Sequence, residues 1–179
     1  MEQVSETDTS WKNNGLRWGI ILGLIKMILM LVIYIIDFSL LLDWKLKWLM
    51  NIVEAIAWIF IGKSFYSSHQ NVAFAQVLLH GLILFVMTDL VVLGYNLCLY
   101  NIIDVYLPEK LADESVQRTE EVMQNFMSKD RLDAELASVR EKITNGYGVI
   151  PQLIGFAYGL IGSGMLALIS TLFIHKRQK

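Results

Sequence analysis

Three charged side chains interrupt long apolar stretches of the sequence: Lys26 in GIILGLIKMILM, Glu54 in NIVEAIAWIF and Asp89 in VMTDLVVLG. A charge at the centre of a membrane-spanning helix costs about 2.5–3.5 kcal/mol on an insertion scale, so such a residue faces a partner or water. Counting from the ends of the stretches places all three residues near mid-depth. We therefore expect one intramembrane charge cluster, built from one cation and two carboxylates.

Three interpretations of this cluster stay open. Lys26 and one acid form a structural ion pair that fixes the order and register of the helices. Alternatively, the three groups belong to a path for protons or ions, or they face another membrane protein. Because one carboxylate exceeds the single cation, we expect that acid to be protonated, hydrated or hydrogen-bonded.

A secondary polar face, Gln76 with His80, lies on roughly the opposite side of the helix that carries Asp89. This arrangement predicts a central helix with neighbours on both sides, and hydrogen bonds between helices at His80. The nearest approach to a nucleophile is Ser163 in IGSG, but a GxSG motif requires glycine where Ile161 stands. The sequence also lacks HExxH, CxxC, a Walker loop and a nucleotide fingerprint. We expect no catalytic residue, no metal site, no cofactor and no enzymatic activity.

The elements that must position these residues are apolar runs. With 55% hydrophobic and 18% charged residues among 179, the composition is far too apolar for an ordinary soluble domain. A helix needs about 20 apolar residues to cross a hydrocarbon core about 30 Å thick. We therefore predict an all-α, polytopic membrane protein. Its polar N-terminal tail covers residues 1–14, and residues 15–106 hold three transmembrane helices at about 16–36, 44–63 and 72–104. Residues 148–179 hold the fourth helix, at about 149–174, and a basic C-terminal tail.

The third run is long for one span. A continuous helix from Val72 to Tyr106 would rise about 50 Å, well beyond the bilayer core. We expect it to project into water, with Pro108 at its end or at the start of the next element.

Residues 107–147 form a charged segment between the third and fourth spans. Apolar residues recur there at near-helical spacing, most regularly at Leu132, Leu136, Val139 and Ile143. This pattern predicts an extramembrane insertion of two amphipathic helices, which could form a hairpin and which ends near Asn145. Their apolar faces either pack on each other or on the third helix, or form a docking surface for a protein or for lipid headgroups.

Glycines at four-residue spacing predict close packing between helices. The first span carries Gly15, Gly19 and Gly23, and Lys26 projects within the same arc of the helix. The fourth span carries Gly155 and Gly159. Because small residues let helix backbones approach closely in lipid, we expect the first and fourth helices to pair, within one chain or between two copies.

The distribution of basic residues predicts the orientation. With four spans, both termini share one side with the loop at 62–71, and this side carries most of the basic residues of the short segments. The positive-inside rule then places both termini in the cytoplasm. The net charge is −2, and the sequence contains no basic stripe. Nucleic acid is therefore not expected as a partner. The expected partners are the lipid bilayer and either a second copy or another membrane protein.

Four stretches resemble a family of uncharacterised bacterial four-helix membrane proteins, domain of unknown function 4199 (DUF4199). They are NGLRWGIILGLI, FAQVLLHG, LYNIIDVYL and GLIGSGMLALISTLFIHKR, and the order of parts matches over nearly the whole chain. Gln76 stands where the family pattern has an acid, and Val105 where it has proline. The resemblance implies a multi-pass protein of the bacterial inner (cytoplasmic) membrane and supplies no activity.

Two functions follow as hypotheses. The leading one is a non-enzymatic structural or accessory membrane protein that acts through helix packing, oligomerisation and its exported helical segment. The other is a small oligomeric transporter or channel that uses Lys26, Glu54 and Asp89.

Overall fold

The computed structural model describes residues 3–67 and 72–175, and this part of the chain is all-α. Its elements, in chain order, are α1 (Gln3–Ile36), the 3-10 helix η1 (Phe38–Leu42), α2 (Trp44–Tyr66), α3 (Phe74–Cys98), the π-helical turn η2 (Leu99–Ile103), α4 (Leu107–Met123), α5 (Lys129–Gly146) and α6 (Val149–His175). Four segments are long and apolar enough to cross a membrane: Ser10–Ile36, Trp44–Tyr66, Phe74–Ile103 and Val149–Ile174. The α1 helix already begins at Gln3, so the polar residues 3–14 are helical.

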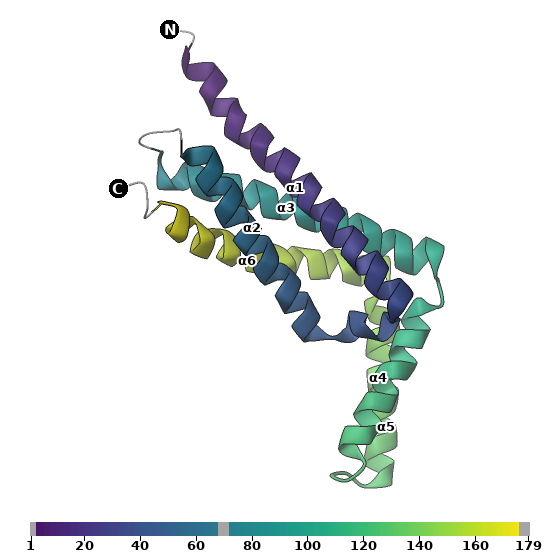
Figure 1. The fold of residues 1–179 in the computed structure, drawn as a ribbon. Coiled ribbons are helices and arrows are strands. Elements are labelled where there is room, and N and C mark those ends of the chain that lie inside the picture. Colours follow the sequence, from purple (N-terminus) through teal and green to yellow (C-terminus); the bar gives the residue numbers. More distant parts are fainter. Residues whose placement is uncertain (1–2, 68–71, 176–179) are drawn as a thin grey trace.

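The α3 helix is central to the bundle and packs along both α1 and α6, while α2 packs mainly on α6. The N-terminal end of α1 and the C-terminal end of α6 lie at one end of the bundle (Figure 1). The α4 and α5 helices leave from the other end. The outward faces of the four long helices are apolar and exposed, as at Ile36 (75% exposed) and Phe60 (70%). Such faces are suited to contact with lipid.

Short polar caps set the turn between α1 and α2. The Asp37 carboxylate accepts a hydrogen bond from the Ser39 backbone N–H at 2.9 Å, and Asp43 accepts one from Lys45 N–H at 2.8 Å. Each cap satisfies a backbone donor that has no partner within its own helix. The chain therefore reverses within a single 3-10 turn between the two helices.

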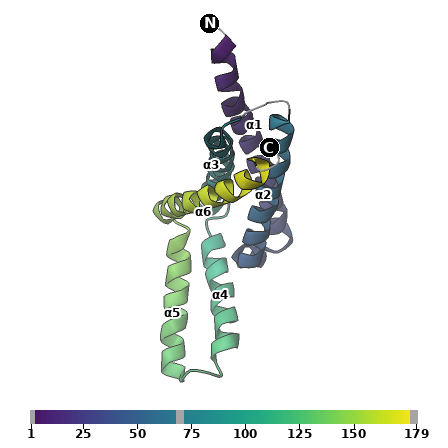
Figure 2. The same ribbon diagram turned by 90° about the vertical axis from the view of Figure 1, so that its left-hand side faces the viewer.

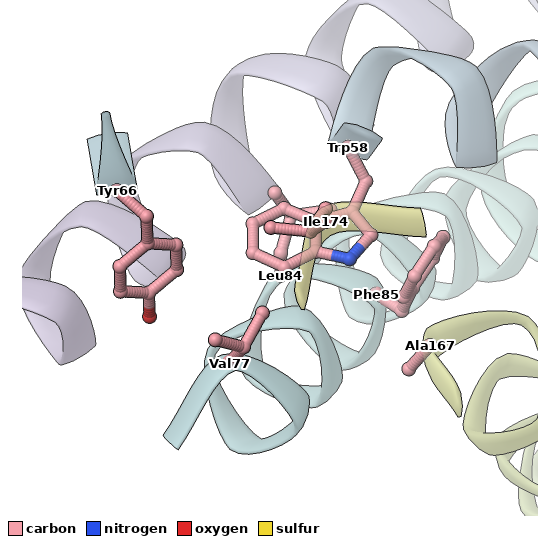
Figure 3. Close-up of a cluster of buried hydrophobic side chains, with 7 residues drawn as sticks. All are labelled: Trp58, Tyr66, Val77, Leu84, Phe85, Ala167 and Ile174. Carbon is pink, nitrogen blue, oxygen red and sulfur yellow. The ribbon is translucent and has the colours of Figure 1, made fainter. Parts of the chain in front are cut away.

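Two buried clusters hold the helices together. The first cluster lies toward the N-terminal end of α1 and the C-terminal end of α6. It joins α2, α3 and α6 through Trp58, Tyr66, Val77, Leu84, Phe85, Ala167 and Ile174 (Figure 3). The second cluster joins the turn after α1 to the region around η2 and α4, through Met30, Leu41, Leu99, Tyr100, Leu107 and Leu111. The second cluster thus ties the base of the α4–α5 pair to the four long helices.

The third long helix does not continue to Tyr106, contrary to the expectation from its length. Its α-helical part ends at Cys98, the π-helical turn follows, and the chain leaves the helical conformation at Asp104. Pro108 lies in the first turn of α4, where its missing N–H costs no hydrogen bond. The break redirects the chain instead of letting one helix project straight onward.

The α4 and α5 helices form an antiparallel hairpin that stands away from the bundle (Figure 2). Leu111, Ala112 and Leu132 are buried, so the two apolar faces pack on each other and on the bundle at the base. Lys110 Nζ lies 2.9 Å from Asp104 Oδ2, which also accepts a hydrogen bond from Tyr34 at 3.0 Å. These contacts fix the base of the hairpin to α1 and η2.

Candidate functional site

The three charged residues of the apolar runs come together in the structure, each from a different helix. Lys26 Nζ of α1 lies 3.0 Å from Glu54 Oε2 of α2 and 3.9 Å from Asp89 Oδ1 of α3. Lys26 also donates to Asn51 Oδ1, one turn before Glu54, at 3.0 Å. The ammonium group therefore has its closest partners on α2.

The α6 helix contributes the fourth side of the cluster through Ser163. Its hydroxyl donates to Asp89 Oδ2 at 2.6 Å, a short hydrogen bond typical of a charged acceptor. Asp89 thus receives a neutral donor at close range and the ammonium group only at a longer distance. Lys26 and Glu54 form the tighter ion pair.

Burial differs among the three groups. The Glu54 side chain is 7% exposed, Lys26 is 14% exposed and Asp89 is 23% exposed. With both acids ionised, the cluster carries two negative charges and one positive charge. Glu54 Oε1 is buried and has no hydrogen-bond partner among the described residues. The cluster therefore has one negative charge in excess, and Glu54 still has a carboxylate oxygen that accepts no hydrogen bond from the described residues.

The cluster lies at a cleft of about 650 Å³ between α2, α3 and α6. Glu54, Asp89 and Ser163 line it together with Asn51 and with the apolar side chains of Trp48, Phe85, Val92, Leu93, Phe156, Met165, Leu166 and Ile169. Two amides, Asn96 and Gln152, line it as well. A cleft of this size is in the range of binding sites for small molecules, about 300–1,000 Å³.

One end of the cleft is closed and the other is wide. A Cβ atom on Gly62 of α2 would lie 2.6 Å from Ile174 of α6, so these helices touch near their last turns. By contrast, Cβ atoms on Gly155, Gly159 and Gly162 would meet nothing within 4 Å. Both ribbon views show α2 and α6 diverging toward the hairpin (Figures 1 and 2). The cleft therefore widens toward the end that carries the hairpin.

The glycines of α1 pack on α3, not on α6. Cβ atoms added to Gly15, Gly19 and Gly23 would come within 2.9, 2.6 and 2.7 Å of atoms of His80, Leu84 and Val91. The expected pairing of the first and fourth helices within one chain is thus wrong. Gly155 and Gly159 line the cleft instead, because no helix of the described chain covers them.

His80 lies among aromatic side chains at the closed end of the bundle. It is fully buried, its Nδ1 atom lies 2.9 Å from the Tyr66 hydroxyl of α2, and its ring centroid lies 4.7 Å from that of Trp58. Gln76, one turn earlier, is half-buried. The His80 ring pairs with Tyr66, and the Ser163 hydroxyl donates to Asp89. His80 and Ser163 therefore do not form a hydrogen-bonded serine–histidine pair with each other.

Helical periodicity identifies some members of this site and not others. Asn51 and Asn96 share helix faces with Glu54 and Asp89, so periodicity brings them to the cluster. Ser163 and Gln152 are neutral residues in a glycine-rich run, a pattern that indicates packing. Within the described residues, no group of three His, Cys, Asp or Glu side chains is placed to hold a metal ion.

Comparison with known sequences gives a family match. The profile of a family described as "Protein of unknown function (DUF4199)" matches residues 17–176. No curated protein and no solved structure matches the chain. The matched range contains every residue of the charge cluster and of the cleft.

Proposed function

Because the chain belongs to the DUF4199 family, whose function is unknown, we propose a function from the site itself. In this proposal the chain is a non-enzymatic, multi-pass membrane protein. It binds a small cationic solute in the α2–α3–α6 cleft and carries that solute across the membrane. The observation that carries this proposal is the position of the charge cluster. Glu54 and Asp89, the two partners of Lys26, line a cleft of about 650 Å³ instead of a filled helix interface.

A purely structural ion pair needs no cleft. Buried ion pairs are stable when partner groups satisfy every donor and acceptor and when water is excluded. Here Glu54 keeps an oxygen without a partner among the described residues, and the Asp89 side chain is 23% exposed. Ionisable residues that line a cavity at membrane depth are typical of substrate or ion pathways.

We place both termini in the cytoplasm and the hairpin on the opposite side of a bacterial inner membrane. The α4–α5 hairpin is rich in charged residues, and its helices are too polar to cross a membrane. The basic residues Lys12, Arg17 and Lys63 belong to the end of the bundle opposite the hairpin. In this orientation the wide end of the cleft faces the extracytoplasmic side.

Flux through proteoliposomes tests the proposal. Purified protein should give a cation flux that depends on pH and that Asp89→Asn abolishes, because the substitution removes the more exposed carboxylate. Glu54→Gln should also reduce the flux, and Asp133→Asn, an exposed change on α5, serves as the matched control. If the Asp89 and Glu54 variants conduct like the parent and lose only thermal stability, the cluster is structural and the proposal fails.

A second function, association with a partner through the hairpin, is favoured by its tip. Val122 is 64% exposed, Phe126 83% and Met127 41%. Apolar side chains grouped at a projecting tip are typical of contact sites. Replacing all three with serine should abolish cross-linked complexes in native membranes and leave the bundle folded. Unchanged complexes, or none in either form, would argue against this role.

A further inference from the structure

The charge and the walls of the cleft identify the class of solute more closely. We infer that it is an organic ammonium ion, a protonated amine on an apolar body about the size of one aromatic ring, whose ammonium group binds at Asp89. This inference rests on the proposed function, because it names the substrate of the same cleft.

Charge balance selects a cation. Among the described residues that line the cleft, Glu54 and Asp89 are the ionisable ones, and both are acids. The cation of the cluster, Lys26, already lies 3.0 Å from both Glu54 and Asn51. A second cation, Lys47, lines the adjoining pocket with Asn96 and Gln152 and is not among the residues that line the cleft. An anionic solute at Asp89 would meet no positive group among the described residues that line the cleft, whereas a bound cation would give two ion pairs for the two acids.

The polar atoms at the cleft select a hydrogen-bond donor. Asn96 Oδ1 and Gln152 Oε1, like Glu54 Oε1, are buried acceptors without a partner among the described residues. A buried acceptor left without a donor costs about 1–3 kcal/mol. An ammonium group brings three N–H donors to the Asp89 carboxylate. Asn96 lies about two helical turns, roughly 10 Å, further along α3, so it lies beside the far end of a solute bound at Asp89.

The walls select an apolar body. Most of the lining side chains are aromatic or aliphatic, including Trp48, Phe85 and Phe156. Replacing the water shell of an alkali metal ion needs several oxygen ligands around one point. The walls supply few, and the oxygens of Glu54 and Asn51 already contact the Lys26 ammonium group. The walls do fit an apolar group, and an aromatic wall also attracts an organic cation through its ring face. The unfilled space beside Gly155 and Gly159 gives that body room.

The two acids have different roles in this arrangement. Glu54 is the deeper one and holds Lys26, so it positions the cluster. Asp89 is more exposed, and Ser163 orients its carboxylate from α6 through a 2.6 Å hydrogen bond. Asp89 Oδ1 lies 3.9 Å from Lys26 Nζ, further than Glu54 does. Asp89 is therefore the acid that can bind a second cation.

Calorimetric titration of the full-length protein in a maltoside detergent tests the inference. The probe is 2-phenylethylammonium, and the matched compounds are 2-phenylethanol, which is neutral, and 3-phenylpropanoate, which is anionic. The parent should bind the ammonium saturably and bind the other two at least about 10-fold more weakly. Asp89→Asn should weaken binding of the ammonium about 10- to 100-fold, the loss typical of a hydrogen bond to a charged group. Asp133→Asn should bind like the parent.

A second variant keeps the test decisive if Asp89→Asn does not fold. Ser163→Ala removes the hydroxyl that orients the Asp89 carboxylate and keeps both acids, so it should leave the fold intact and still weaken binding several-fold. Equal binding of 2-phenylethanol, or no binding of the ammonium by the folded parent, overturns the inference. If the parent then still gives an Asp89-dependent flux of protons or potassium in liposomes, the proposed function stands without it. If the parent neither binds the ammonium nor gives an Asp89-dependent flux, both the inference and the proposed function are refuted.

Discussion

Removing the cation of the cluster should be far more damaging than removing an exposed lysine. Lys26→Met keeps the length and apolar stem of the side chain but leaves Glu54 buried without its partner at 3.0 Å. At this distance and an effective dielectric constant of about 20, the gross attraction is about 5 kcal/mol. Breaking a buried pair on one side costs about 3–5 kcal/mol. We expect a loss in this range in the free energy of unfolding.

A double-mutant cycle isolates the pair. Glu54→Gln removes the matching charge, so the double variant Lys26→Met/Glu54→Gln no longer buries an unpaired carboxylate at this position. Its loss of stability should be smaller than the sum of the two single losses by about 2 kcal/mol, as for residues in direct contact. The measurement is unfolding by SDS in mixed maltoside micelles, followed by tryptophan fluorescence, with Lys142→Met on α5 as the exposed control.

Two results would refute this reasoning. The first is a loss below about 1 kcal/mol for Lys26→Met, similar to the change expected of an exposed control. The second is additivity within about 0.5 kcal/mol across the cycle, which is typical of residues that do not interact.

Three further predictions test other parts of the structure. Gly19→Ala should destabilise the protein by about 1–3 kcal/mol, because its Cβ would lie 2.6 Å from a backbone oxygen of α3, whereas Gly159→Ala should be neutral within about 0.5 kcal/mol in the same unfolding assay. The hydrogen bond from Lys110 lowers the pKa of Asp104 below its ordinary value of 3.8, so its stabilisation is present above about pH 4 and is lost as the pH falls further. Protease cleavage of the hairpin base should therefore increase below about pH 4 in the parent and depend less on pH in Asp104→Asn. Phe126→Ser should change the unfolding free energy by less than about 0.5 kcal/mol, because Phe126 is 83% exposed.

Each of these predictions has an outcome that contradicts it. Equal losses for the two glycine variants would mean that α1 does not pack closely on α3. Parallel pH profiles for the parent and Asp104→Asn would remove Asp104 from the anchoring of the hairpin. A large loss for Phe126→Ser would mean that the tip is packed against another part of the chain.

The sequence could predict the meeting of the charges but not the cleft beside them. A charge within an apolar span must find a partner, and similar depth in different helices limits the choice, so depth and helix face are enough to link Lys26, Glu54 and Asp89. Whether α2 and α6 touch or diverge depends on the packing of the whole bundle. No local pattern in the sequence encodes that divergence.

The glycine motif shows a similar limit. Small residues at four-residue spacing predict that one face of α1 is closely packed, and it is. The motif carries no information about the partner, which is α3. The change from α-helix to π-helix after Cys98 is equally hidden, because the run from Leu99 to Ile103 is mostly apolar, like the helix before it.

We propose that the cleft beside the charge cluster is accessible to water from the side of the hairpin, and one labelling experiment tests this arrangement most directly. In a Cys98→Ser background, Gly159→Cys places a thiol on the cleft wall where a Cβ meets nothing within 4 Å. A membrane-impermeant, water-soluble thiol reagent added from the hairpin side should label this cysteine, and 2-phenylethylammonium should slow the labelling in this background but not when Asp89→Asn is added. No labelling from that side, with normal labelling of the denatured protein, would contradict an open cleft.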